Sequence, residues 1–338
     1  MTKRISIRKS DARKRKDDLL HLATIFSGIG VAEMAHRKVF GYSGTIFACE
    51  IDKFARRSYE ANALNHQNVP FYEDVRTLDA TRYRGQIDVL VGGSPCQDFS
   101  IAGERAGTGG DRGNLIWQYY RIVKECRPEV FVFENVKGFL SIEKGKAYVN
   151  FLNALRSLGY HCHAEVLNTK DYGIPQNRER LYVVGFLDAD RYFSFRFAPK
   201  QPLKLTLGDM LETSVDEKYF LSERAIRCFK KKDNNFQGSF SPKNPSGTAN
   251  CLTTAAGNRR TDTFIIQRPR DFNKGGERIR KLTPRECLRL QGIGDDFKIV
   301  VSDTQIYKQA GNAMSQNVVE MILGQIVGSL KKNFKLGA

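Results

Sequence analysis

The sequence predicts an α/β fold in which a doubly wound, mostly parallel sheet is followed by a second, smaller and loop-rich domain. The first observation is a βαβ rhythm of apolar runs and amphipathic helical patterns up to about residue 190. The second is the loss of that rhythm beyond this point, where polar and turn-forming residues dominate 233–262. The chain has 338 residues, 41% of them hydrophobic, which is enough for a sizeable buried core.

Strands and helices alternate in the first half of the chain. Continuous apolar strands separated by amphipathic helices are typical of a parallel sheet covered on both faces, whose ligands lie beyond the carboxyl ends of the strands. We therefore expect functional side chains where a strand meets the loop that follows it. The expected strands are residues 22–26, 45–51, 69–75, 87–93 and 130–136, and the expected helices are 31–40, 53–64 and 114–126.

Helical patterns return near the end of the chain. Thr283, Pro284 and Glu286 have the spacing of an N-cap, a first-turn proline and a capping box. A last helix near 314–330 carries Val318, Ile322 and Ile326 on one face, which suits it to pack back on the first domain. The predicted division is a basic flexible arm at 1–18, a first domain at 19–192, a second domain at 193–280, a hinge at 281–310 and a returning C-terminal segment at 311–338.

The composition favours a polyanionic partner. The formal net charge of +17 attracts nucleic acid or an anionic membrane surface. Nucleic acid is the better match, because no stretch approaches the roughly 20 continuous apolar residues of a membrane span. No apolar signal core follows the basic N-terminal segment, so we expect a cytoplasmic protein. Seven cysteines without paired spacing argue against a disulfide scaffold and a metal site.

Three strand ends predict a nucleoside-binding pocket. The Phe26–Gly30 turn follows the first strand and opens a helix, so its backbone N–H groups can approach a ligand. Glu50 ends the next strand, where a carboxylate can accept both hydroxyl hydrogens of a ribose. Asp74 ends the third and could accept from an adenine amino group. These features fit either a nicotinamide or a methyl-donor cofactor.

A cysteine and a carboxylate follow the next two strands. Cys96 lies in the stiff segment GGSPCQDFS directly after the strand at 87–93, where a buried structural cysteine is unusual. Glu134 belongs to ENV at the end of the strand at 130–136, so its carboxyl group should face the same edge. Arg178 and Arg180 precede another apolar strand and could bring a guanidinium to that carboxylate.

Taken together, these motifs resemble the carbon-5 cytosine DNA methyltransferase family of bacteria and their phages. The resemblance implies the S-adenosylmethionine-dependent methyltransferase fold, with a target-recognition domain at 193–280. It also implies transfer of a methyl group to carbon 5 of a cytosine in a specific double-stranded DNA sequence. The matching segments occur in the family's usual order: FSGIG, ACEID, the Asp74 strand end, GGSPCQDFS, FENVKGF, QNRERLYVVGF, RKLTPRECLRLQG and QAGNAMSQNV.

The resemblance also assigns roles to residues. Cys96 is the nucleophile that attacks carbon 6 of a flipped-out cytosine, Glu134 and Arg180 bind the base, and Arg178 is their companion. The cofactor S-adenosyl-L-methionine is expected at Phe26, Ser27, Gly28, Gly30, Glu50, Ile51, Asp74, Val75, Pro95, Leu115, Asn312 and Ala313. Candidates for DNA contact, in the closing loop and around the segment resembling the target-recognition core, are Gln97, Ser100, Arg105, Arg112, Thr253, Asn258, Arg259 and Arg260.

Other functions fit parts of the same pattern. A transfer RNA cytosine methyltransferase shares the catalytic set, although the sizeable recognition segment favours DNA. A catalytically idle DNA-binding regulator is disfavoured by the joint presence of Cys96, Glu134 and Arg180. A nicotinamide-dependent oxidoreductase is disfavoured because FSGIG lacks a third glycine. We expect a monomer that binds neither metal nor membrane, acting separately from any cognate restriction endonuclease.

Overall fold

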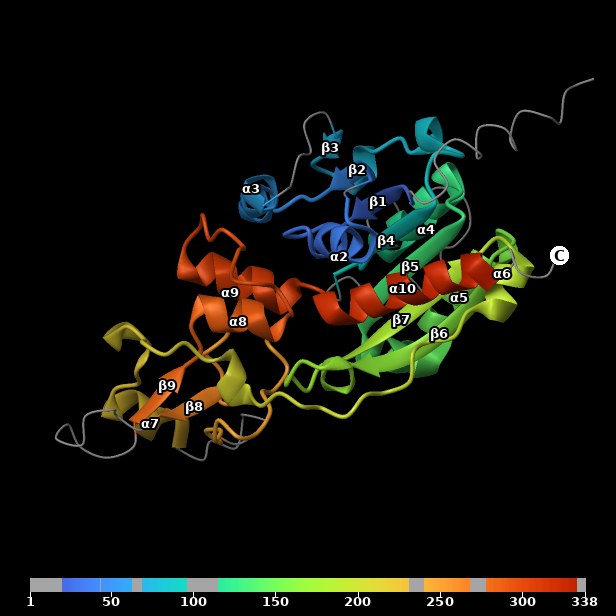
Figure 1. Cartoon of the computed structure of the whole chain (residues 1–338). Coiled ribbons are helices and arrows are strands. Elements are labelled where there is room, and N and C mark those ends of the chain that lie inside the picture. The colour runs from blue at the N-terminus through green and yellow to red at the C-terminus, as the bar shows by residue number, and fades with distance from the viewer. Residues whose placement is uncertain are drawn as a thin grey trace, which may run out of the picture.

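A seven-stranded sheet with helices on both faces forms the centre of the computed structural model (Figure 1). The structure describes residues 20–42, 44–62, 69–95, 115–230, 240–267 and 278–332. The strands are β1 (Leu22–Ile25), β2 (Thr45–Cys49), β3 (Phe71–Tyr72), β4 (Val89–Gly92), β5 (Val130–Val136), β6 (His161–Asn168) and β7 (Glu179–Phe186). They lie in the order β3-β2-β1-β4-β5-β7-β6.

The sheet confirms the predicted mostly parallel, doubly wound topology. β1 pairs in parallel with both β2 and β4. From β1 the chain continues to β2 and β3 on one side, and from β4 it continues to β5 on the other side, so the strand order reverses between β1 and β4. Such a reversal of strand order leaves a crevice at the carboxyl edge of the sheet. Strand β7 is an exception to the parallel pairing, since it pairs antiparallel with both β5 and β6.

Successive residues along each strand pack into two separate cores, one on each face of the sheet, as expected for a sheet buried on both faces. Leu90 packs in the core that contains Tyr119 of α4 (Leu115–Cys126) and Phe151 of α5 (Lys146–Ser157). Its neighbours Val89 and Val91 belong to the core on the other face, which includes α2 (Val31–Phe40). Among the described residues this half also contains the helices α3 (Lys53–Asn62) and α6 (Ala189–Ser194).

The last helix returns to the sheet as predicted. Helix α10 (Gln316–Lys332) crosses the sheet beside α2 in Figure 1. Val318, Ile322 and Ile326 are each 1% exposed or less and pack against strand residues of that face. The C-terminal segment therefore belongs to the core of the first half of the chain.

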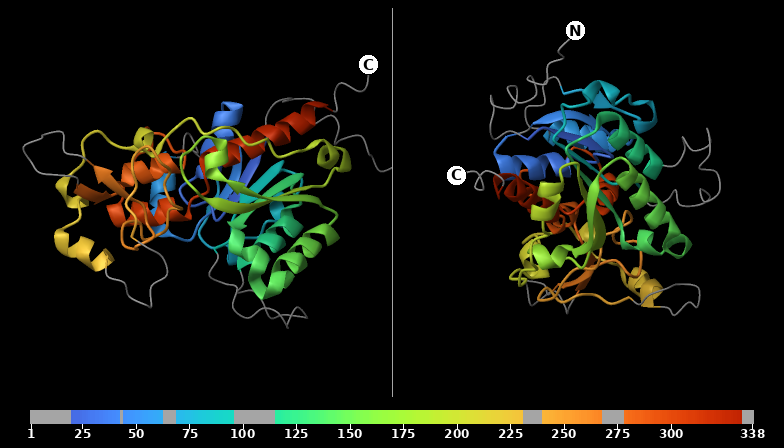
Figure 2. Two further views of the ribbon diagram at one scale, coloured as in Figure 1. Left: turned by 90° about the horizontal axis from the view of Figure 1, so that it is seen from below. Right: turned by 90° about the vertical axis from the view of Figure 1, so that its right-hand side faces the viewer.

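The intervening chain forms a loop-rich body beside the carboxyl edge of the sheet (Figure 2). It contains α7 (Glu223–Lys230), the antiparallel pair β8 (Phe264–Gln267) and β9 (Arg278–Lys281), α8 (Pro284–Leu290) and α9 (Asp303–Asn312). The capping box of α8 forms as predicted, with Thr283 accepting from Glu286 N and the Glu286 carboxylate accepting from Thr283 N. The domain boundaries given above remain predictions.

Short 3-10 helices occur in both halves of the chain. They are η1 (Val75–Thr77), η2 (Thr81–Tyr83), η4 (Lys137–Gly145), η5 (Thr169–Tyr172), η6 (Leu207–Met210) and η7 (Glu217–Tyr219). Among the described residues no helix has the length and apolar character needed to cross a membrane. Within the same residues no group of three or more His, Cys, Asp or Glu side chains is placed to hold a metal ion.

Candidate active site

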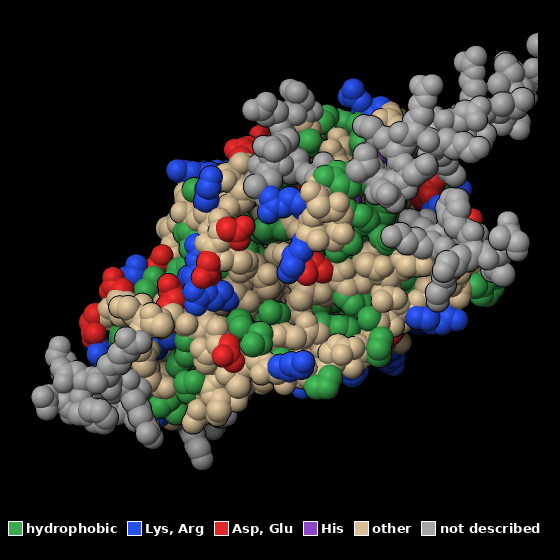
Figure 3. All heavy atoms as spheres, viewed as in Figure 1, with side chains coloured by type: hydrophobic (Ala, Val, Ile, Leu, Met, Phe, Trp, Pro, Cys, Tyr) green, Lys and Arg blue, Asp and Glu red, His purple; other side chains and the backbone are tan. Residues whose placement is uncertain are grey.

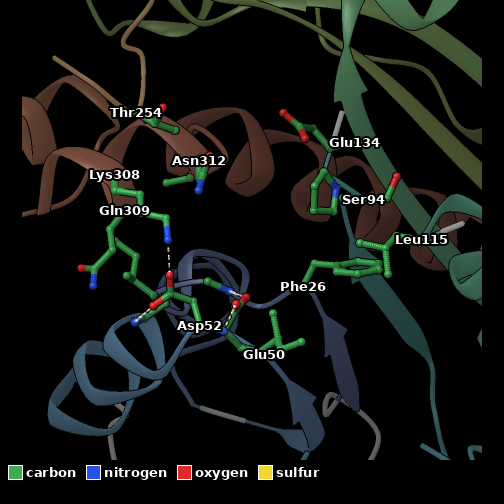
Figure 4. Close-up of a pocket in the computed structure, with 18 of the residues that line it drawn as sticks. Phe26, Glu50, Asp52, Ser94, Leu115, Glu134, Thr254, Lys308, Gln309 and Asn312 are labelled. Atoms are coloured by element: carbon green, nitrogen blue, oxygen red, sulfur yellow. Dashed lines mark hydrogen bonds and ion pairs between the residues drawn. The ribbon is translucent and has the colours of Figure 1, made fainter. Parts of the chain in front are cut away.

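A pocket of about 690 Å³ lies at the carboxyl edge of the sheet, where the loop-rich body meets it. This volume is in the range of small-molecule and cofactor sites. Figure 4 shows the two sides of the pocket: Glu50, Asp52 and Phe26 come from the first strands, while Lys308, Gln309, Asn312 and Thr254 face them from the other side. The crevice expected from the strand order is thus closed by a distant part of the chain.

The turn after β1 holds the carboxylate of Glu50 in place. Gly28 adopts a left-handed conformation with φ 56°, and its N–H donates to Glu50 Oε2 at 2.8 Å. Asp52 N donates to the other carboxylate oxygen at 2.8 Å. Burial raises the pKa of Glu50, while these two N–H groups act in the opposite direction. The carboxylate is therefore fixed in orientation before any ligand arrives.

Apolar side chains beside Glu50 suit a flat aromatic ring. Ile51 is 63% exposed, an unusual state for a large apolar residue, and it lines the pocket together with Phe26 and Leu115. Exposed apolar surface inside a pocket is typical of a ligand site. A fixed carboxylate next to apolar walls fits the ribose and adenine of a nucleoside cofactor.

The Asp74 carboxylate lines the pocket but already has partners. It caps η1 by accepting from Arg76 N at 2.9 Å, and it pairs with the Arg76 guanidinium at 2.7 Å. This arginine lowers the pKa of Asp74. An adenine amino group would therefore share this carboxylate with Arg76.

Most of the predicted cofactor residues meet in this pocket. Ten of the twelve line it: Phe26, Gly28, Glu50, Ile51, Asp74, Val75, Pro95, Leu115, Asn312 and Ala313. Ser27 and Gly30 are absent from the lining and support the turn instead. The Ser27 hydroxyl bonds to Thr24 at 2.7 Å and to the Cys49 carbonyl at 3.1 Å, while Gly30 is the left-handed N-cap of α2.

Asn312 reaches the pocket because α9 packs tightly on the segment after Leu252. A Cβ at Gly311 would lie 2.4 Å from the backbone carbon of Thr253, so only glycine allows this approach. Lys308, one turn earlier, forms an ion pair with Asp52 at 2.6 Å. Helix α9 is thereby tied both to the loop-rich body and to the loop after β2.

Glu134 and Arg180 form an ion pair at the other end of the pocket. Arg180 Nε lies 3.3 Å from Glu134 Oε1, and each side chain is 15% exposed or less. Burial raises the pKa of Glu134, although the guanidinium groups of Arg180 and Arg178 oppose that shift. Burial alone would lower the pKa of Arg180, but the Glu134 carboxylate raises it overall. The carboxyl group is therefore easier to protonate than an exposed Glu.

The loop that leads to Cys96 packs directly on Glu134. A Cβ on Gly93 would lie 2.8 Å from both the carbonyl and a carboxylate oxygen of Glu134, which requires glycine there. Asn135 donates to the Ser94 carbonyl at 3.3 Å and to its hydroxyl at 3.2 Å. Pro95 lines the pocket. Cys96 itself lies outside the described residues, as do Gln97, Ser100, Arg105 and Arg112.

Arg178 spans the junction between the two halves of the chain. Its guanidinium donates to the carbonyls of Leu252 at 3.2 Å, Gly311 at 3.1 Å and Ala313 at 2.7 Å. The residue is 2% exposed and borders the pocket. Three backbone carbonyls thus accept from the two terminal nitrogens of the guanidinium, while its buried Nε has no partner among the described residues. The contacts of Arg178 therefore join three segments of the pocket wall.

Sequence reasoning missed Cys251 as a pocket residue. Its sulfur lies 3.6 Å from Arg178 Nη1 and 3.7 Å from Arg180 Nη2, so it contacts both guanidinium groups. The signal was present, because Cys251 belongs to the segment that resembles the target-recognition core. Further lining residues that were not predicted are Ile29, Cys49, Asp52, Ala55, Glu73, Arg76, Gly93, Ser94, Asn135, Val136, Leu252, Thr254, Lys308, Gln309 and Gly311.

The described candidates for DNA contact divide into two groups. Thr253 and Arg259 line the pocket. Asn258 and Arg260 belong to the adjoining loop, where Asn258 N donates to Asp262 at 3.1 Å and the Arg260 guanidinium donates to the Cys228 carbonyl at 3.3 Å. Neither residue lines the pocket, and the Arg260 side chain has a partner on α7 while Asn258 is exposed.

Comparison with known proteins defines the class of enzyme. Residues 20–328 match the family model of the C-5 cytosine-specific DNA methylases. The chain therefore belongs to that family, and it is a DNA (cytosine-5-)-methyltransferase.

Individual relatives agree with this assignment. The chain is 33% identical over 328 residues to the type II methyltransferase M1.ScrFI of Lactococcus lactis subsp. cremoris, covering 95% of this chain and 81% of that protein. It is 36% identical over 316 residues to the type II methyltransferase M.HpaII of Haemophilus parainfluenzae, covering 88% and 86%. The Dnmt2 methyltransferase of S. pombe shares the fold, with a TM-score of 0.72 at 21% identity over 92% of this chain and 99% of that one.

Proposed function

We propose that this enzyme transfers a methyl group from S-adenosyl-L-methionine to carbon 5 of a cytosine within a specific double-stranded DNA sequence. The observation that carries the proposal is the shared pocket. It joins a fixed Glu50 carboxylate with apolar walls at one end to the Glu134–Arg180 pair and Pro95, next to Cys96, at the other. This arrangement supports a cofactor site and a base site side by side in one cavity.

The residues present fit the proposed cofactor. Glu50 would accept from the ribose hydroxyls, and Ile51 and Phe26 would pack on the adenine. When bound, S-adenosyl-L-methionine supplies an electrophilic methyl group. Asn312 and Ala313 would close the pocket from the side of α9.

The reactive cytosine carbon is stacked inside a DNA duplex, so the base must rotate out into the pocket, at a cost of roughly a few kcal/mol. Cys96 would add its thiolate to carbon 6, which makes carbon 5 nucleophilic. After carbon 5 gains the methyl group it loses its proton, and the bond between sulfur and carbon 6 breaks. The cysteine is thereby regenerated.

Glu134 and Arg180 would hold the edge of the flipped base. The raised pKa of Glu134 suits a carboxyl group that shares a proton with ring nitrogen 3 while its other oxygen accepts from the amino group. Arg180, 3.3 Å from that carboxylate, would donate to the ring carbonyl. The pull on ring nitrogen 3 draws charge away from carbon 6 and assists thiolate attack.

The setting we propose is the bacterial cytoplasm. The type II methyltransferases that the chain resembles are named for restriction-modification systems, which supports a role beside a separate cognate endonuclease. We propose that the enzyme acts on DNA as a monomer.

Covalent trapping tests the mechanism. Duplex DNA carrying 5-fluorocytosine at its target cannot lose a proton from carbon 5, so the enzyme should remain bonded to the base after methyl transfer. Peptide mass spectrometry should place the adduct on Cys96, and Cys96→Ala should form no adduct while still binding S-adenosylhomocysteine. An adduct on another cysteine, or normal turnover by Cys96→Ala, would overturn the proposal.

The substrate requires a second measurement. Mixed-sequence duplex DNA and transfer RNA are incubated separately with labelled cofactor, and the products are sequenced at base resolution. We expect 5-methylcytosine at one recurring DNA sequence. Label confined to RNA would contradict the DNA assignment and leave the chemistry of Cys96 intact.

A further inference from the structure

Helix α7 has an apolar face and a basic face. Phe229 stacks on Phe240 with ring centroids 5.3 Å apart and also contacts Phe264 at 5.1 Å, which anchors the helix to β8. Arg224, Arg227 and Lys230 are exposed. They are spaced three residues apart, so they follow one another along the same side of the helix at roughly 5–6 Å intervals.

Several other cations of the loop-rich body are held in ion pairs, unlike these three. Arg278 pairs with Glu217, Arg280 with Glu286, Arg289 with Asp295 and Lys218 with Asp303. On the face drawn in Figure 3, likewise, many Lys and Arg side chains lie beside Asp or Glu. In the part of the chain that the structure describes, the three basic side chains of α7 form no ion pair or hydrogen bond.

A single loop connects the basic face with the pocket. Arg259 lines the pocket, and the next residue, Arg260, donates its guanidinium to the Cys228 carbonyl on α7 at 3.3 Å. If one nucleotide of a nucleic acid occupied the pocket, the neighbouring nucleotides would therefore pass Arg259 before they reached α7. Figure 1 places α7 beyond β8 and β9, at the end of the molecule far from β6, so contact there would fall on DNA that flanks the target.

We propose that α7 is a phosphate-binding surface, on which Arg224, Arg227 and Lys230 bind the DNA backbone outside the recognised sequence. The stripe spans seven residues, from Arg224 to Lys230, or roughly 9 Å of helix. Duplex DNA carries about one negative charge per 1.7 Å of its axis, so several phosphates fall within reach. This inference rests on the proposed duplex substrate. Contacts between α7 and the DNA backbone would add affinity that does not depend on the base sequence.

A charge-matched pair of variants tests the surface. One replaces Arg224, Arg227 and Lys230 by Gln, and the control replaces Arg82, Arg84 and Lys124, which are exposed and precede β4 and β5 at the opposite edge of the sheet. Binding of a duplex without a target site is measured at salt concentrations from about 50 to 300 mM, where the release of counterions from DNA strongly affects the affinity. Thermal unfolding of both variants verifies that they fold.

The α7 variant should lose affinity at every salt concentration, and its plot of log K against log salt should be flatter by about 2 to 3, since each phosphate contact contributes roughly 0.9. The control should keep the wild-type slope. Equal slopes for the two variants would overturn the role of α7 and leave the methyltransferase assignment standing if both still methylate DNA. A wild type that neither binds nor methylates duplex DNA would overturn both.

The exposed thiol of Cys228 gives an independent readout on the same helix. Its alkylation by a maleimide is followed by peptide mass spectrometry, which separates it from the other cysteines. Duplex DNA should slow this alkylation severalfold in the wild-type protein and much less in the α7 variant. Alkylation at the same rate with and without saturating DNA would contradict the proposed contact.

Discussion

Arg180 Nε lies 3.3 Å from Glu134 Oε1, and the two residues come from the antiparallel neighbours β7 and β5. The reversed direction of β7 is what brings an arginine at the start of one strand to a carboxylate near the end of another. The edge of a base placed against both groups would meet the carboxyl group of Glu134 and the guanidinium donor of Arg180 side by side. The departure from a fully parallel sheet therefore creates the edge at which we propose that the base binds.

Glu134→Gln should slow methyl transfer by roughly 10² to 10⁴-fold, because an amide cannot share a proton with ring nitrogen 3. Single-turnover rates with saturating DNA and cofactor measure the effect. The matched control is Glu165→Gln, an exposed Glu on β6. A Glu134→Gln enzyme as fast as this control would remove the carboxyl group from the mechanism.

Glu50→Gln should weaken binding of S-adenosylhomocysteine by roughly 10 to 100-fold, the loss expected when a charged acceptor of hydrogen bonds becomes neutral. Isothermal titration calorimetry gives the dissociation constant. Glu60→Gln, exposed on α3, should leave that constant unchanged. Identical affinities for the two variants would show that the ribose binds elsewhere.

Arg178→Lys should destabilise the fold more than it alters the chemistry. A lysine cannot reach the carbonyls of Leu252, Gly311 and Ala313 together, and unpaired buried groups should lower the free energy of unfolding by about 3 kcal/mol. Thermal unfolding should shift down by roughly 5 to 10 °C. Exposed Arg156→Lys is the control. Unchanged unfolding with lost activity would instead make Arg178 a substrate-binding residue.

Gly311→Ala and Gly324→Ala form a matched pair. An added Cβ at Gly311 would meet backbone atoms of Thr253 and Thr254 at 2.4 to 2.6 Å, whereas one at Gly324 meets nothing within 4 Å. The first change should destabilise by about 1 to 3 kcal/mol and weaken cofactor binding. The second lies inside α10 and should stabilise by roughly 0.5 to 1 kcal/mol. Urea unfolding measures both, and equal effects would contradict the tight approach of α9.

Glu33 should make stability depend on pH. It is buried beneath the turn after β1, accepting from Thr24 at 2.5 Å and Tyr59 at 3.0 Å, and burial raises its pKa. The folded state therefore favours the protonated form. Its stabilising contribution is complete below about pH 4.3, the ordinary value for Glu, and is lost as pH rises through the raised pKa.

The measurement is the difference in unfolding temperature between the wild-type protein and Glu33→Gln at several pH values. The wild type should lose stability relative to the variant as pH rises above about 4.3, because only the wild type must ionise or retain a proton there. Parallel curves across that range would mean that Glu33 has an ordinary pKa in the folded protein.

The positions of many site residues could be predicted from the places where strands end in the sequence. Parallel strands share a carboxyl edge, so Glu50, Asp74 and Glu134 could be placed near one another before their contacts were known. The capping box at Thr283 and the return of α10 also followed from local patterns. Asn312 could be placed in the pocket only through the family resemblance, since nothing in its local sequence shows what α9 packs against.

Other features needed three-dimensional contacts. Sequence cannot distinguish an arginine that binds substrate from one whose donors are used by carbonyls, and Arg178 has three such partners. Nor does a strand pattern give direction, so the antiparallel pairing of β7 was not foreseen. Cys251 contacts two arginines that are over 70 residues away in the chain. The basic residues of α7 likewise needed the structure, because sequence does not show that they lack partners among the described residues.

The contribution of Asn312 to the pocket also governs when the enzyme can begin to work during its synthesis. A growing chain that has already folded its strands still lacks one wall of the cavity until α9 has left the ribosome and settled beside the turn after Leu252. Unfinished or prematurely terminated polypeptides would therefore bind methyl donor poorly and leave host DNA unmarked. Modification would therefore require molecules translated at least through α9.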